Sequence, residues 1–105
     1  MKRKKNTNDG SENWSHKHDY PIDDVWNTDN TLALLIAQRL RAFRELDKHG
    51  CPQDMKDMQQ WNWTLLKMEN AFELMSCTYF YSEKDRKTAQ EGLELFCKYF
   101  LDLWD

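Results

Sequence analysis

The chain has 105 residues, of which 40% are hydrophobic and 13% aromatic, a composition that supports one compact core but not two. The formal net charge is -3, and because residues 1–20 carry +2, the rest of the chain carries -5 (-3 minus +2). An acidic body argues against duplex nucleic acid, whose binding requires many basic side chains. No apolar run approaches the ~20 residues that span a bilayer, so no membrane partner is expected.

The first 19 residues are polar and basic, with one isolated aromatic residue, Trp14. Such a segment buries too little apolar surface to fold alone, so residues 1–19 are predicted to form a disordered tail. Its basic residues suit either phosphate contact or solubility, and that choice stays open. His16 and His18 form a His-x-His pair without further ligands in sequence, so no metal site is predicted.

Residues 20–105 are predicted to form a single helical domain that begins with an extended lead-in from Tyr20 to Trp26. The first helix is expected over about 29–48, capped by a side chain of residues 28–30 and stopped by a left-handed Gly50. Its predicted apolar stripe consists of Leu32, Leu35, Ile36, Leu40, Phe43 and Leu46. Arg39 falls in the middle of that stripe.

A second helix is expected over about 55–80, with Asp54 as its cap. Its apolar positions step by three and four, as in a helix that packs along its whole length: Met58, Trp61, Leu65, Met68, Phe72, Met75 and Tyr79. Trp63 and Leu74 lie on a different face, more than 100° away. They therefore predict a second contact surface.

A third helix is expected over about 83–104, where Ser82 and Asp85 form a capping box. Its apolar stripe is Ala89, Leu93, Phe96, Phe100 and Leu103, and Leu95 and Tyr99 lie outside it. Two of the three helices are thus apolar on more than one side, which is typical of a bundle that self-associates. The predicted fold is all-α, a compact bundle of three main helices with an extended N-terminal lead-in. The predicted homo-oligomer interface comprises Trp63, Leu74, Leu95 and Tyr99.

Catalytic patterns are weak in this chain. Asp23 and Asp24 are neighbours whose side chains diverge, and His49 and Cys51 are separated by a glycine turn that seldom orients a nucleophile and a base. The three cysteines lack paired spacing and are expected to be buried thiols in a reducing cytosol. We therefore expect no enzyme, no catalytic residues, no metal and no cofactor.

Arg39 is the most informative polar residue, because a buried guanidinium requires a partner. One reading is a salt bridge to an acid such as Asp23, Asp24 or Glu69. The other is a pocket in which Arg39 offers its planar fork to a phosphate or carboxylate. The candidate ligand-binding residues for such a pocket are Tyr20, Trp26, Arg39, Trp61 and Lys67, with the two tryptophans as aromatic walls.

Several strings in the chain resemble a family of small accessory proteins encoded by tailed bacteriophages. They are Asp23-Asp24-Val25-Trp26-Asn27, Leu32-Ala33, Arg39-Leu40, Ala71-Phe72-Glu73-Leu74, Glu91-Gly92-Leu93, Lys98-Tyr99-Phe100 and Leu103-Trp104-Asp105. The resemblance covers about Tyr20 to Asp105, and its closing motif is the most specific part. Gln59, Gln60 and Asn62 stand where the family carries acidic residues around the second-helix tryptophan.

This resemblance implies an accessory protein of infection, located in the host cytoplasm, of the kind that often counters host immunity. A possible relation is to the anti-CBASS sponges, small helical oligomers that bind a cyclic oligonucleotide and lower its free concentration by mass action. Two alternatives remain open. One is an acidic protein-protein inhibitor of a host nuclease or CRISPR effector, supported by acidic residues including Glu69 on faces expected to be exposed, and the other is a phage assembly or scaffold component.

Overall fold

The computed structural model describes residues 14–15, 20–21 and 23–105, with side chains from Val25 onward. Its elements are the strands β1 (Trp14–Ser15) and β2 (Tyr20–Pro21), the helices α1 (Asp23–Trp26), α2 (Thr28–Glu45), α3 (Met58–Cys77) and α4 (Glu83–Tyr99), and a final 3-10 turn, Phe100–Asp102. The two strands pair antiparallel, with Trp14 opposite Pro21. Most of the predicted tail, including His16 and His18, lies outside the described residues.

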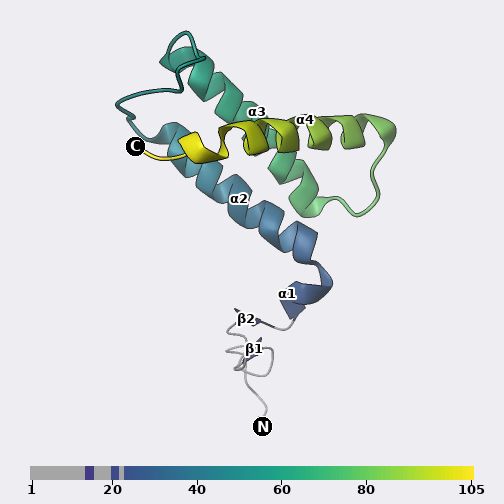
Figure 1. Cartoon of the computed structure of the whole chain (residues 1–105). Coiled ribbons are helices and arrows are strands. Elements are labelled where there is room, and N and C mark those ends of the chain that lie inside the picture. The colour runs from purple at the N-terminus through teal and green to yellow at the C-terminus, as the bar shows by residue number, and fades with distance from the viewer. Residues whose placement is uncertain (1–13, 16–19, 22) are drawn as a thin grey trace.

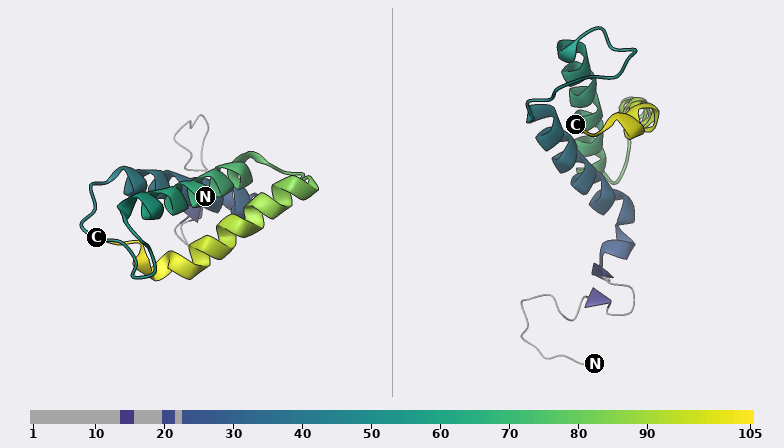
Figure 2. Two further views of the ribbon diagram at one scale, coloured as in Figure 1. Left: turned by 90° about the horizontal axis from the view of Figure 1, so that it is seen from above. Right: turned by 60° about the vertical axis from the view of Figure 1, so that its left-hand side comes forward.

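The predicted all-α bundle of three main helices is confirmed. α3 lies in the middle and packs along both α2 and α4, whereas α2 and α4 make few direct contacts (Figure 1; Figure 2). The largest fully buried side chains, Trp61, Leu65 and Met68, all come from α3. The seam predicted along this helix is therefore real, although the helix ends at Cys77 and Tyr79 lies beyond it, exposed.

α2 turns a different face to α3 from the one that its large side chains predict. The buried apolar residues are Ala33, Ala37 and Leu40, whereas Leu32 and Leu35 are about half exposed. Small side chains let two helix backbones approach closely, so the alanines occupy the contact and the leucines remain outside.

Arg39 is consequently exposed on the outer side of α2. The expectation that its guanidinium is buried in an apolar stripe is wrong. An exposed guanidinium is solvated by water, so the argument for an obligatory buried partner no longer applies to Arg39.

α4 also packs through its smallest residue. A Cβ built on Gly92 would overlap the Cβ of Ala71, so only a hydrogen atom fits at this crossing with α3. Leu93 and Phe100, which belong to the predicted stripe, are instead exposed. Two of the predicted stripe residues therefore lie at the surface, because the glycine sets the contact face.

The end of α2 is formed by a lysine rather than by a glycine. The helix ends at Glu45, and Gly50, which the sequence marked as a left-handed stop, does not adopt a left-handed conformation. The buried Lys48 Nζ donates to the carbonyl oxygens of Phe43, Arg44 and Leu46 at 3.1, 3.0 and 3.2 Å. These bonds satisfy carbonyls that the helix leaves without a partner at its end. Burial lowers the pKa of the Lys48 ammonium.

The starts of α3 and α4 follow the predicted capping chemistry, with one shift in position. Ser82 Oγ accepts from the Asp85 N–H at 3.0 Å, so the predicted cap of α4 is confirmed. The cap of α3 is Asp57, whose side chain accepts from the Gln60 N–H at 2.9 Å, and not Asp54. α3 therefore begins at Met58 rather than near residue 55.

Asn30, one of the expected caps of the first helix, has a different role. The N-cap position of α2 is Asn27, which makes no side-chain cap hydrogen bond. Asn30 is buried and its Nδ2 donates to the carbonyl oxygens of Met75 at 2.7 Å and Thr78 at 3.3 Å. Asn30 thus joins the start of α2 to the end of α3.

An ion pair joins α2 to α3. Arg44 Nε donates to Glu69 Oε1 at 2.7 Å, with side-chain exposures of 25% and 5%. The hydrogen bond to Glu69 raises the pKa of the Arg44 guanidinium. The burial of Glu69 corrects the expectation that this residue lies on an exposed acidic face.

Candidate functional site

Four of the five predicted ligand residues have described side chains, and these four occupy different environments. Trp61 is 1% exposed in the core, where its ring packs edge-on against Phe43 and Tyr99. Trp26 is 80% exposed at the end of α1, and Arg39 and Lys67 are exposed on α2 and α3. Tyr20 belongs to β2, and its side chain lies outside the described residues.

The four residues predicted for an oligomer interface also occupy different environments. Trp63 faces away from the core, with 61% of its surface exposed, and Leu74 is half-buried. Leu95 packs against the core, and Tyr99 is buried. The Tyr99 hydroxyl donates to Asp54 Oδ2 at 2.9 Å, so this residue is already engaged inside the chain.

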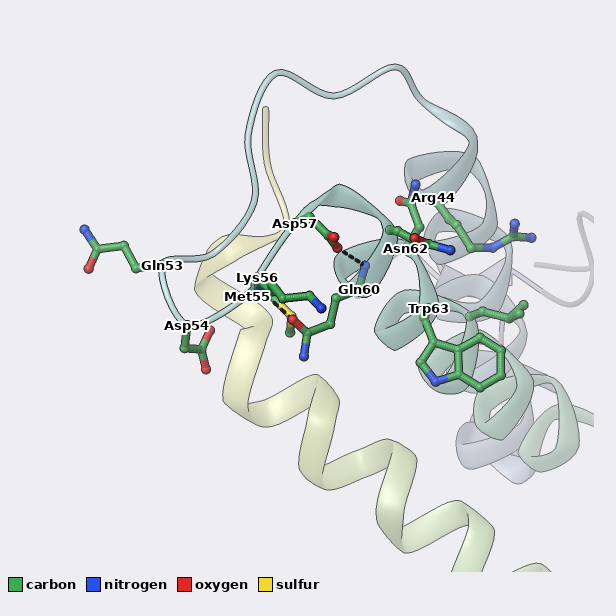
Figure 3. Close-up of a pocket in the computed structure, with 11 residues that line it drawn as sticks. Arg44, Gln53, Asp54, Met55, Lys56, Asp57, Gln60, Asn62 and Trp63 are labelled. Atoms are coloured by element: carbon green, nitrogen blue, oxygen red, sulfur yellow. Dashed lines mark hydrogen bonds between the residues drawn. The ribbon is translucent and has the colours of Figure 1, made fainter.

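An open groove of about 980 Å³ lies beside the segment that connects α2 to α3 (Figure 3). This volume lies at the upper end of the range of small-molecule sites. The residues that line it are Arg44 from α2, residues 53–57 from the connection, and Gln59, Gln60, Asn62, Trp63 and Leu66 from α3.

Trp63 provides the apolar wall of this groove, and its indole is largely open to solvent. The neighbouring α3 positions carry amides, which can both donate and accept hydrogen bonds. Gln60 is already used, since its Oε1 accepts from the Lys56 N–H at 2.6 Å. Asn62 Oδ1 is a buried acceptor that has no hydrogen-bond partner among the described residues.

The charges around the groove are mostly engaged in the fold. Asp57 caps α3, Arg44 pairs with Glu69, and Asp54 accepts from Tyr99 and lies 3.6 Å from Lys98 Nζ. Burial and the hydrogen bond to Asp54 raise the pKa of Tyr99. Within the described part of the chain, Lys56 forms no ion pair, so its ammonium is the charge of the groove that remains available to an anion.

A second, smaller hollow of about 380 Å³ lies between residues 49–52 and the last residues of the sequence. Asp105 holds it together, because Oδ1 accepts from the His49 N–H at 2.8 Å and Oδ2 lies 2.9 Å from His49 Nδ1. These hydrogen bonds lower the pKa of Asp105, with the backbone bond as the largest cause. The hollow also contains Cys51 beside His49. The hydrogen bonds between Asp105 and His49 serve to fix the segment that follows α2.

The cysteines are the clearest error in the expected chemistry. Cys51, Cys77 and Cys97 are all exposed, whereas the sequence was interpreted as having buried thiols. Among the described residues, no group of three or more His, Cys, Asp or Glu side chains is arranged to hold a metal ion. Nor does any helix of that part of the chain combine the length and hydropathy required to cross a membrane.

Comparison with known proteins adds no relative, because no protein-family model, curated protein or solved structure matches this chain. The site must therefore be interpreted from its own residues.

Sequence reasoning identified Trp63 as outward-facing but missed the groove beside it. The signal was the group of three amide side chains at the start of the helix, Gln59, Gln60 and Asn62. What the sequence could not supply was the position of the connecting segment. Residues 53–57 lie against the start of α3 partly because Asp54 contacts Tyr99 from the far end of α4.

Proposed function

We propose that this chain is a non-enzymatic accessory protein of a tailed bacteriophage that sequesters a cyclic nucleotide second messenger in the host cytoplasm. The phage setting rests on the resemblance of residues 20–105 to phage accessory proteins. The ligand class rests on one observation, the 61% exposed indole of Trp63 beside the groove of about 980 Å³. Nucleobases stack on exposed aromatic faces, and each stacked base contributes roughly 1–3 kcal/mol.

The groove supports this proposal with contacts for each part of a nucleotide. Trp63 offers a stacking surface, and the amides of Gln59 and Asn62 are of the residue types that recognise base edges. Lys56 supplies a positive charge for a phosphate. A single available ammonium suits a ligand with few phosphates, and it does not suit a long duplex, which would require many basic contacts.

A thermal-shift panel of cyclic dinucleotides and trinucleotides tests the proposal. We expect at least one of them to raise the melting temperature of the wild-type protein, because a ligand that binds only the folded state stabilises it. Trp63→Ala is expected to abolish the shift. Trp26→Ala is the matched control, since Trp26 is 80% exposed but outside the groove, and it should leave the shift unchanged.

Absence of a shift with every nucleotide would refute the ligand class, and an equal loss in both tryptophan variants would refute the groove as its site. A separate measurement tests whether the protein binds the nucleotide without cleaving it. The nucleotide is expected to be recovered intact by chromatography after the complex is incubated and then heat-denatured. Recovery of a linearised product would contradict the non-enzymatic part of the proposal.

A further inference from the structure

We infer that the groove selects adenine, and that Asn62 is the residue that distinguishes adenine from guanine. This inference rests on the proposed nucleotide function and names the base that the same groove binds. It depends on three features of the described residues: the face of α3 that lines the groove, the unused acceptor of Asn62, and the ion pair that engages Arg44.

One face of α3 carries both a stacking surface and side-chain amides. Gln59, Asn62, Trp63 and Leu66 all line the groove, and Asn62 and Trp63 are neighbours in sequence (Figure 3). Their spacing places the four residues within an arc of about 100° around the helix. A base that stacks on the Trp63 indole therefore meets side-chain amides at its edge.

Asn62 has an acceptor that the fold does not use. Its Oδ1 is buried and has no hydrogen-bond partner among the described residues, although Asn62 as a whole is half-buried and lines the groove. An unpaired buried acceptor is unfavourable, so a donor that reaches it stabilises the amide. The terminal bond of an asparagine side chain turns easily, because its torsional preference is broad. A ligand N–H in the groove is therefore a suitable partner for Oδ1.

The edge of adenine matches an amide in both directions. Adenine presents the N6 amino group as a donor beside the N7 acceptor, so Asn62 Oδ1 would accept from N6 while Nδ2 donates to N7. On the corresponding edge, guanine presents two acceptors, O6 and N7, and would leave Oδ1 without a donor. Asn62 therefore favours adenine over guanine.

The two cations that line the groove have other roles. Guanine edges are commonly recognised by arginine or lysine side chains. Arg44 Nε donates to the buried Glu69 carboxylate at 2.7 Å, which holds this guanidinium in the contact between α2 and α3. Lys56 is the other cation among the lining residues, and the proposed function assigns it to a phosphate. The amide of Asn62 is thus the group left to choose the base.

Isothermal titration calorimetry of the full chain with three cyclic dinucleotides tests the inference. Cyclic di-AMP carries adenine, cyclic di-GMP carries guanine, and cyclic di-IMP carries hypoxanthine, which has an oxygen in place of the adenine amino group. We expect cyclic di-AMP to bind at least about tenfold more tightly than either of the others, which is the effect of one good pair of hydrogen bonds to a base edge.

Equal or tighter binding of cyclic di-GMP or cyclic di-IMP would overturn the inference and leave the proposed function standing. Failure of all three to bind would also overturn it, and the wider nucleotide panel then decides separately whether the proposed function survives.

Asn62→Leu removes the amide and keeps a side chain of similar size. We expect this variant to bind cyclic di-AMP only as tightly as cyclic di-GMP, with the affinity for cyclic di-GMP unchanged. It should fold, because the lost acceptor has no partner among the described residues, and circular dichroism checks this. Asn70→Leu is the matched control, since Asn70 is exposed on the same helix outside the groove, and it should retain the preference. A preference that persists in Asn62→Leu, or that Asn70→Leu removes equally, would overturn the role of Asn62.

Discussion

Arg44 and Glu69 form the ion pair that joins α2 to α3, with Arg44 Nε 2.7 Å from Glu69 Oε1. The Glu69 carboxylate is the more buried partner, at 5% side-chain exposure, so its charge must be stabilised by the Arg44 guanidinium. The same arginine borders the groove, so this pair ties the packing of two helices to the wall of the candidate site.

Replacing Arg44 by methionine is expected to lower the free energy of unfolding by about 3 kcal/mol. The reason is that the variant leaves a buried carboxylate without its partner, which costs more than the pair itself contributes. Urea denaturation followed by circular dichroism measures the change. Arg41→Met is the control, because the exposed pair of Arg41 with Glu45 should contribute less than ~1 kcal/mol. Equal losses in the two variants would contradict the special role of Glu69.

Gly92→Ala is expected to destabilise the bundle by roughly 1–3 kcal/mol, the usual cost of overpacking a close contact. The added methyl group would overlap the Cβ of Ala71 at the crossing of α3 and α4. Ala71→Gly in the same chain removes the overlap and should restore part of the loss in a thermal melt. Gly50→Ala has no atom within 4 Å of the added carbon and should change stability little. A double variant as unstable as Gly92→Ala would show that the crossing is not the cause.

Asn30→Ala is expected to cost about 1–3 kcal/mol, because the change leaves the Met75 carbonyl oxygen without the Asn30 donor and opens a small gap. The same denaturation experiment on Asn27→Ala provides the comparison, since Asn27 is exposed and makes no side-chain cap hydrogen bond. Asn27→Ala should remain within about 0.5 kcal/mol of the wild type. If Asn30→Ala is equally neutral, the side chain does not join α2 to α3 in solution.

The lowered pKa of Asp105 predicts that the free energy of unfolding depends on pH. Hydrogen bonds from His49 lower the pKa of Asp105 in the folded protein below its ordinary value of 3.8. The ionised carboxylate therefore contributes stability that is present above pH 3.8 and is lost as the pH falls through the lower, folded-state pKa. The difference in unfolding free energy between wild type and Asp105→Asn should shrink when the pH is lowered from 7 to 3. A difference that stays constant would exclude this linkage.

The sequence was most informative where large apolar residues also form the core. The spacing of Trp61, Leu65 and Met68 placed the buried side of α3 correctly, and Ser82 marked the start of α4. Both features depend on the spacing of nearby apolar residues and on local hydrogen bonds, which can be predicted directly from the sequence.

The errors in the contact faces of α2 and α4 share one physical cause, which is that closest approach between helices is set by small residues. Ala33 and Gly92 carry little weight in a hydrophobic pattern, yet they define the contact faces of α2 and α4. Once these faces are fixed, Arg39 becomes exposed, whereas Trp61, one of the expected walls of its pocket, is buried in the core. The groove depends on Asp54 meeting Tyr99, a contact between residues 45 positions apart that no local pattern could reveal.

The hydrogen bonds of Lys48 affect how its amine reacts with chemical reagents. An amine reagent attacks an accessible, unprotonated lysine, and the Lys48 Nζ is held by three backbone carbonyls inside the fold. Lys67, by contrast, is exposed on α3 and can react while the protein stays folded. The rate of covalent labelling at Lys48 therefore reports how often the last turn of α2 opens. The labelling rate of Lys67 provides the reference value for an exposed lysine.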